Sequence, residues 1–359
     1  MRTRFALAIL ASLLASPAAP STAMAAEGED GVVEAAIEGY VRPAYAEFHA
    51  RAEDLSGSVG RLCAGPAPAG LDDVRAAFRK SVEAWSRVEL LRIGPVTEEN
   101  RLERILFWPD RKGTGLKQVQ AALATEDKTA ADPATLAGKS VAMQGLGALE
   151  YVLFGTGSDE LAGTAGYRCA YAAAIATNVA AIAGAVEEEW RRPGGFAEQW
   201  SRPGAPNPSF RDETEARNEL LAIFVDGLEL LRDQRLAFLG EAAGDDKPKQ
   251  ALFWRSELTV ANLAGGVDGL ARLFEASRLA GLLSADQAWI ADSIRFEFAN
   301  AARAADGVQG PIDEALKDPA RRGALAYFRI VTSSLSELFG TRLAAELGLT
   351  AGFSSLDGD

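Results

Sequence analysis

Residues 191–210 read RRPGGFAEQWSRPGAPNPSF, and this stretch separates two helical halves of the chain. Its density of proline and glycine indicates a loop or linker, because both residue types interrupt regular structure. On either side of it, apolar residues recur at spacings of three and four, the period of an amphipathic helix, and strand patterns are scarce. The expected fold is therefore all-α, with two four-helix-bundle-like domains joined by residues 191–210.

Each half contains four predicted helices. Those of the first half, residues 26–190, cover 29–62 with Pro43 as a kink or break, 71–92, 133–154 and 164–191, with an extended excursion at 95–132. Those of the second half, residues 211–359, cover 211–240, 248–277, 284–306 and 319–347. The two halves share loose features, which leaves a distant internal duplication as one interpretation.

The first 25 residues have the pattern of a cleaved secretory signal. A basic start, MRTR, precedes the apolar run FALAILASLLASPAA, and Ala23-Met24-Ala25 offers a small-x-small cleavage site. No cysteine lies near this site, so a lipid anchor is not expected. No later stretch is expected to be long and apolar enough to span a bilayer. We therefore expect a periplasmic protein without stable membrane insertion.

The chain is strongly acidic. Its formal net charge is −13, and removal of residues 1–25, which hold Arg2 and Arg4 but no acid, leaves 35 basic against 50 acidic residues, or −15. Such a charge repels nucleic acid and anionic lipid. The expected partners are cations, neutral small molecules or other exported proteins.

The chain has two cysteines, Cys63 and Cys169. In an oxidising compartment they are candidates for a disulfide, and the alternative is two unpaired, buried small residues. Two cysteines are too few for a structural zinc site.

His49 is the only histidine. A zinc peptidase of the HExxH kind needs two histidines on one helical face, and that motif is absent. A serine triad would have to use His49, and no GxSxG motif accompanies it. We interpret His49 as a partly exposed surface residue.

Residues 143–155, MQGLGALEYVLFG, read as part of a helix that contains Gly145 and Gly147. At 3.6 residues per turn, Gly147 and Glu150 share one stripe, while Gly145 lies on a neighbouring stripe of small residues suited to close packing. Glu150 therefore points to the interior or to an interface. A buried carboxylate needs a cation, hydrogen-bond donors or a proton, and an ion pair with an arginine of another helix is the common solution.

Residues 92–113, RIGPVTEENRLERILFWPDRKG, are dense in charged and aromatic side chains. Pro109 is expected to end a helix at Trp108. One interpretation is a polar pocket, and the alternative is a clamp whose aromatics cap a bundle and whose charges pair locally. The candidate pocket residues are Asn100, Arg101, Trp108 and Asp110.

The second half repeats a similar mixture in FWRSELTVANLAGGVDG, residues 253–269. Arg255 and Glu257 are candidates to face the first domain across a cleft. The alternative is ordinary surface charge on a bundle helix.

Taken together, these segments resemble the imelysin family, an exported all-helical group first classed as peptidases. The resemblance rests on IGPVTEENRLERILFWPDRKG, GLGALEYVLFG, FWRSE and the terminal LGLTAGFSSLDGD, which occur in the expected order. It implies a pair of helical bundles with a site where they meet. The family hallmark is G-x-H-x-x-E on a helix, and here Gly145 and Glu150 match it, whereas Gly147 stands at the histidine position.

Without that imidazole, Glu150 alone is a poor metal ligand unless other oxygen ligands converge on it. Peptidase activity is correspondingly not expected. Family members are often tied to iron acquisition, so the resemblance implies a role in metal or haem handling, with iron or another divalent metal as the implied cofactor. The leading hypothesis is a non-enzymatic exported binding protein, and the alternatives are a metallopeptidase and an interaction module for another exported protein. The candidate site comprises Glu150, Gly147, Arg101, Trp108, Asp110, Arg255, Glu257 and Asn100.

Overall fold

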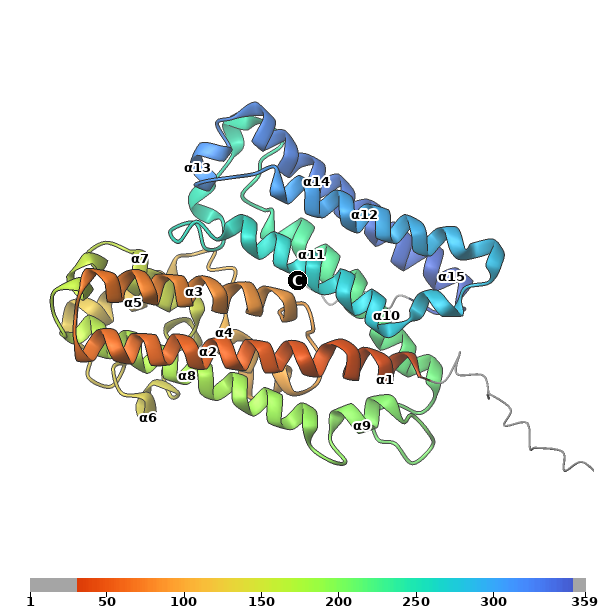
Figure 1. Cartoon of the computed structure of the whole chain (residues 1–359), viewed down its shortest axis with the longest axis horizontal. Coiled ribbons are helices and arrows are strands. Elements are labelled where there is room, and N and C mark those ends of the chain that lie inside the picture. The colour runs from red at the N-terminus through yellow and green to blue at the C-terminus, as the bar shows by residue number, and fades with distance from the viewer. Residues whose placement is uncertain (1–30, 351–359) are drawn as a thin grey trace, which may run out of the picture.

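A computed structural model describes residues 31–350, and within that range the chain is helical and contains no strand (Figure 1). The expected signal, residues 1–25, and the end of the terminal LGLTAGFSSLDGD segment lie outside the described residues. The helices form two layers: α1 to α8 make one, and α10 to α15 make the other (Figure 1). The all-α prediction is confirmed.

Three long helices carry the first layer. They are α2 (Arg42–Ala64), α3 (Pro68–Val88) and α8 (Tyr167–Arg191), and α2 packs against both others. The short α1 (Val32–Ala36) leads into α2 through a π-helical turn at Ile37–Val41. The wider turn lies directly before Pro43, whose nitrogen has no hydrogen to donate. The helix continues through Pro43, where a kink or break was expected.

Shorter elements fill the rest of this layer. They are 3₁₀ turns at Gly94–Asn100, Val141–Met143 and Ser158–Ala162, and the helices α4 (Arg101–Ile105), α5 (Thr114–Thr125), α6 (Pro133–Leu136) and α7 (Leu146–Phe154). The prediction of one helix over 133–154 is therefore wrong, and the excursion at 95–132 is partly helical. Pro109 does not end α4, which stops at Ile105, and the Trp108–Pro109 peptide is cis.

The short α9 (Phe196–Ser201) lies inside the stretch expected to be a linker. The second layer comprises α10 (Glu213–Glu229) with a π-helical turn at Leu230–Arg235, α11 (Thr259–Ser277), α12 (Ala288–Asp306), α13 (Ile312–Ala315), α14 (Pro319–Glu337) with a π-helical turn at Leu338–Leu343, and α15 (Ala344–Glu346). Further 3₁₀ turns lie at Ala243–Asp245, Pro248–Gln250, Leu279–Leu282 and Ala285–Gln287.

α8 corrects one statement made from the sequence. By length and mean hydropathy, 1.7 over its most apolar window, α8 is long and apolar enough to cross a membrane. However, 61% of that window is buried inside the protein, against α2 and α7 among others. The side chains of α8 therefore behave as those of a core helix.

The two layers meet where α3 packs against α11. Small residues permit the contact: a Cβ added at Gly265 would lie 2.6 Å from the Cβ of Ser86, and one at Gly269 would lie 2.3 Å from the carbonyl oxygen of Arg87. One continuous hydrophobic core includes buried side chains from both layers. The relative position of the layers is thus set by close backbone packing, on which any site between them depends.

Two further sequence features are placed within the first layer. A disulfide joins Cys63 at the end of α2 to Cys169 at the start of α8, with Cα atoms 5.6 Å apart. The side chain of His49 is 27% exposed, and its Nδ1 lies 2.6 Å from Oε2 of Glu187. His49 is therefore occupied with a neighbouring carboxylate on α8.

Candidate functional site

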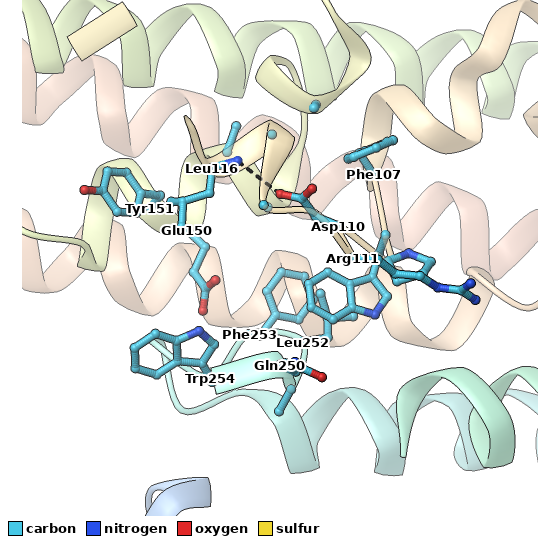
Figure 2. A pocket seen from close by; sticks show the side chains of 18 of the residues that line it. Phe107, Asp110, Arg111, Leu116, Glu150, Tyr151, Gln250, Leu252, Phe253 and Trp254 are labelled. Carbon is cyan, nitrogen blue, oxygen red and sulfur yellow. Dashed lines mark hydrogen bonds between the residues drawn. The ribbon is translucent and has the colours of Figure 1, made fainter. Parts of the chain in front are cut away.

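A pocket of about 410 Å³ lies between the two layers, and Glu150 is on its wall. The first layer contributes residues between Phe107 and Val119 and between Val141 and Tyr151. The second contributes residues from the turn after α10 and from the segment Lys249–Arg255. A volume of this size is typical of small-molecule sites. Figure 2 shows side chains of both layers converging on it.

Glu150 is bound by a loop of the second layer. It is 4% exposed, and its Oε1 accepts hydrogen bonds from the backbone N–H of Arg255 at 3.0 Å, and from the backbone N–H and Oγ of Ser256 at 3.0 and 2.9 Å. The expected ion pair with an arginine of another helix is not formed. Hydrogen bonds from a loop, rather than a salt bridge, therefore compensate the burial of this carboxylate.

That loop is not helical, which corrects the prediction of a helix from residue 248. Phe253 and Glu257 adopt left-handed backbone conformations, with φ of 57° and 60°, and α11 begins only at Thr259. These two residues bound a tight turn that points successive backbone N–H groups at Glu150. The arrangement resembles the backbone concavities that bind anions elsewhere, and here the anion is a side chain of the other layer.

Burial raises the pKa of the Glu150 carboxyl above its ordinary value of 4.5, although the hydrogen bonds from Ser256 and the charge of Arg255 act in the opposite direction. The folded protein thus holds this proton more tightly than the unfolded chain does. The resulting stabilisation is present below the unfolded pKa and is lost as the pH rises through the folded pKa.

We therefore expect Glu150→Gln, which keeps an acceptor for the loop, to gain stability relative to wild type as the pH rises from 4.5 towards neutrality. Urea denaturation at several pH values measures the difference in free energy of unfolding. Glu257→Gln, at an exposed side chain, controls for the charge change. A difference between Glu150→Gln and wild type that stays constant with pH would contradict the assignment.

The two glycines before Glu150 have different surroundings. Gly145 precedes α7 as its N-cap, and a Cβ there would lie 2.3 Å from the carbonyl oxygen of Ile105 and 2.6 Å from that of Arg104. Gly147 is in the first turn of α7 and lines the pocket, and a Cβ there would meet nothing within 4 Å. Gly145 therefore allows α4 to approach, whereas Gly147 leaves space beside Glu150.

Three other predicted residues line the pocket. Trp108 and Asp110 belong to the segment between α4 and α5, and Asp110 also accepts hydrogen bonds from the backbone N–H groups of Thr114 at 2.7 Å and Leu116 at 3.1 Å (Figure 2). Arg255 lies 4.5 Å from the ring centre of Trp254 and 5.3 Å from that of Tyr151. Asp110 thus fixes the start of α5, and Arg255 is held by two aromatic rings.

The remaining three predicted residues do not line this pocket. Arg101 is buried and binds Glu189 of α8 through two hydrogen bonds of 2.9 and 2.8 Å. Asn100 and Glu257 are exposed, and each has a left-handed backbone conformation. Asn100 lies at the start of α4, and Glu257 lies in the turn that binds Glu150. Arg101 therefore pairs with a distant residue of α8 and does not reach the pocket.

Several lining residues were missed. Those with a charged or aromatic side chain are Phe107, Arg111, Tyr151, Asp233, Lys249, Phe253 and Trp254. Phe107 and Arg111 flank predicted residues, Tyr151 follows Glu150, and Phe253 and Trp254 precede Arg255, so proximity in sequence was an available signal. Lys249 carries no such signal, because the apolar pattern of 248–277 predicts one continuous helix.

The donor set does not suit a resident metal ion. In the described range, no group of three or more histidine, cysteine, aspartate or glutamate residues is placed to hold one. Glu150 uses Oε1 for the loop, and Asp110 uses both oxygens for α5. These residues therefore do not form the ligand set of a protein-bound metal ion.

The fold and the pocket define an all-helical protein with a ligand-sized pocket between two packed layers. The chain belongs to the imelysin family, because the family model for imelysin, peptidase M75, matches residues 41–338. No protein with a curated description matches the chain significantly.

Two solved structures share the fold over nearly the whole chain. An imelysin-like protein from Psychrobacter arcticum 273-4 is 19% identical, with a TM-score of 0.74 over 92% of this chain and 98% of that one. A protein from Parabacteroides distasonis ATCC 8503, provisionally described as an iron-regulated protein A precursor, is 13% identical, with a TM-score of 0.69 over 87% of this chain and 95% of that one.

Proposed function

We propose that this protein is an exported, non-enzymatic binding protein with a role in iron-related uptake, and that its ligand occupies the pocket beside Glu150. The observation that carries the proposal is the pocket itself, since two chain segments of each layer line it and Gly147 leaves room inside it. The description of the Parabacteroides protein as iron-regulated and as a precursor supports the iron-related role and the export.

The donor set favours binding over peptidase chemistry. A metallopeptidase needs a metal held by protein ligands and a general base beside it. The pocket contains no histidine, and its carboxylates are already engaged by backbone N–H groups or by a neighbouring arginine. Chelator-sensitive cleavage of a protein substrate, lost in Glu150→Ala, would favour the peptidase instead.

Calorimetric titration tests the proposal with Fe(II), Fe(III), Zn(II) and haem as probes, and with naphthalene acids as organic probes. Gly147→Trp is designed to fill the pocket, because the added side chain starts in open space and is free to project into the pocket. We expect at least one probe to bind the wild type saturably and to lose tenfold or more in affinity in Gly147→Trp. Binding that is unaffected by this variant would show that the pocket is not the ligand site.

Gly147→His is a second prediction from the same space. The new imidazole would lie three residues before Glu150, on one helical face, as in the family motif. We expect the variant to fold and to bind Zn(II) at least tenfold more tightly than wild type, measured by calorimetry and by the shift in Tm with added zinc. The double variant Gly147→His/Glu150→Ala should lose the gain. Equal zinc affinity in all three proteins would contradict the prediction.

A further inference from the structure

Three cationic side chains on the pocket wall form no ion pair with any described residue. Arg255 contacts the rings of Tyr151 and Trp254, and Lys249 lies 5.8 Å from the ring centre of Trp254. Arg111, on the opposite segment of the wall, is exposed. The chain has a net charge of −13, so three cations without an ion-pair partner on one pocket wall differ from the overall charge of the chain.

No carboxylate of the same pocket forms an ion pair with these cations. Asp110 accepts hydrogen bonds from two backbone N–H groups of α5. Asp233 pairs with its neighbour Arg232 at 2.6 Å. Glu150 is bound by the Arg255–Ser256 backbone, and in Figure 2 its carboxylate points towards the Phe253–Trp254 segment, whereas Arg111 extends away from it. The side-chain donors of Arg111, Lys249 and Arg255 therefore remain available to a ligand, while the charge of Arg255 also acts on Glu150.

A residue of the pocket wall also has a donor without an acceptor. Nε1 of Trp108 is buried and has no hydrogen-bond partner. A buried indole N–H normally finds an acceptor, so a ligand oxygen would pair with it only if the Trp108 side chain, which lines the pocket, reoriented on binding. The remaining wall is largely apolar and aromatic, formed by side chains such as Phe107, Val119, Leu252 and Phe253.

We propose that the ligand of this pocket is an anionic organic molecule with an aromatic or apolar body, whose carboxylate or equivalent group binds the cations Arg111, Lys249 and Arg255. The inference rests on the proposed function, since it names the ligand class for the same pocket. An anionic ligand in this pocket differs from the expectation, based on net charge, that the acidic chain binds cations. Iron would then enter the pocket only within such an anionic complex, without a direct protein ligand.

Matched probes of one shape test the ligand class: 1-naphthaleneacetate, the neutral 1-naphthaleneacetamide and the cationic 1-naphthylmethylammonium. Quenching of tryptophan fluorescence and calorimetry both report binding, because Trp108 and Trp254 line the pocket. We expect the carboxylate to bind at least tenfold more tightly than the amide, and the ammonium most weakly.

The variant Arg111→Gln/Lys249→Gln should weaken the carboxylate at least tenfold and the amide less than twofold. Its matched control is Arg79→Gln/Lys80→Gln, which makes the same changes at two exposed α3 side chains outside the pocket, and which should leave both affinities unchanged. Falling affinity for the carboxylate with added salt, but not for the amide, would also support the proposal.

The outcomes distinguish an error in the ligand class from an error in the position of the ligand site. If amide and carboxylate bind equally, and both are displaced in Gly147→Trp, the pocket is the ligand site and the anionic class is wrong. If the probes bind equally well in Gly147→Trp and wild type, or none binds at millimolar concentration, the anionic ligand and the pocket both fail. A carboxylate preference that survives Arg111→Gln/Lys249→Gln assigns the anion to other residues and overturns the proposal.

Discussion

Glu89→Ala is expected to lower the free energy of unfolding by about 3 to 5 kcal/mol, the usual cost of removing one partner of a buried ion pair. The side chains of Glu89 and Arg235 are 1% and 2% exposed and lie 3.0 Å apart, and Asn262 donates a further hydrogen bond of 2.8 Å to Glu89. Without the carboxylate, the guanidinium of Arg235 stays buried and uncompensated, and its Nη1 already has no partner.

This ion pair also joins the two layers. Glu89 directly follows α3, Arg235 ends the π-helical turn after α10, and Asn262 belongs to α11. Gln234 in the same turn and Ala237, two residues after it, line the pocket. Loss of Glu89 should therefore loosen the pocket wall as well as the fold, and weaken any ligand bound there.

Denaturation by urea, with Glu89→Gln and Glu275→Ala as comparisons, measures the effect. Glu89→Gln keeps an acceptor for Asn262 but loses the charge, so an intermediate cost is expected. Glu275→Ala removes an exposed partner of Arg295, with side chains 55% and 44% exposed, and should cost about 1 kcal/mol or less. Equal costs for Glu89→Ala and Glu275→Ala would refute the special role of the buried pair.

The sequence predicted the helical class and most long helices, because amphipathic periodicity and proline positions are local signals. It failed where tertiary contacts override local preference. The stretch 133–154 looks continuous by apolar pattern, yet it is divided because Gly145 must pass the backbone of α4. Similarly, 248–258 looks helical, but its backbone turns to donate hydrogen bonds to Glu150.

Within the candidate pocket, the prediction found residues that carry a charge or a ring in an otherwise apolar stretch, such as Glu150 and Trp108. It included Arg101, because a buried arginine paired with Glu189 across 88 positions looks in sequence like any polar candidate. It missed Lys249, whose place on the wall depends on how the two layers pack. Composition could not show the local positive charge, since net charge averages over the whole surface.

The second large effect expected is at Gly145, where alanine should lower the free energy of unfolding by about 3 kcal/mol. The backbone of Gly145, with φ of −112° and ψ of −168°, is extended and open to any residue, so conformational strain is not the cause. The cause is steric: the added methyl would lie 2.3 Å from the carbonyl oxygen of Ile105, a backbone atom that cannot move without shifting α4.

Gly147→Ala, two positions later, is the matched control and should change stability in the opposite direction. Its methyl meets no atom within 4 Å, and alanine is the better helix former, so a gain of about 0.5 kcal/mol is expected. Urea denaturation of the two variants at one pH compares them directly. The ligand probes should bind Gly145→Ala more weakly, because α4 leads into the segment of Trp108 and Asp110, and this segment would move with it. If Gly145→Ala proved as stable as Gly147→Ala, the close approach of α4 would not be what requires glycine, and the pocket wall would have to be held by other contacts.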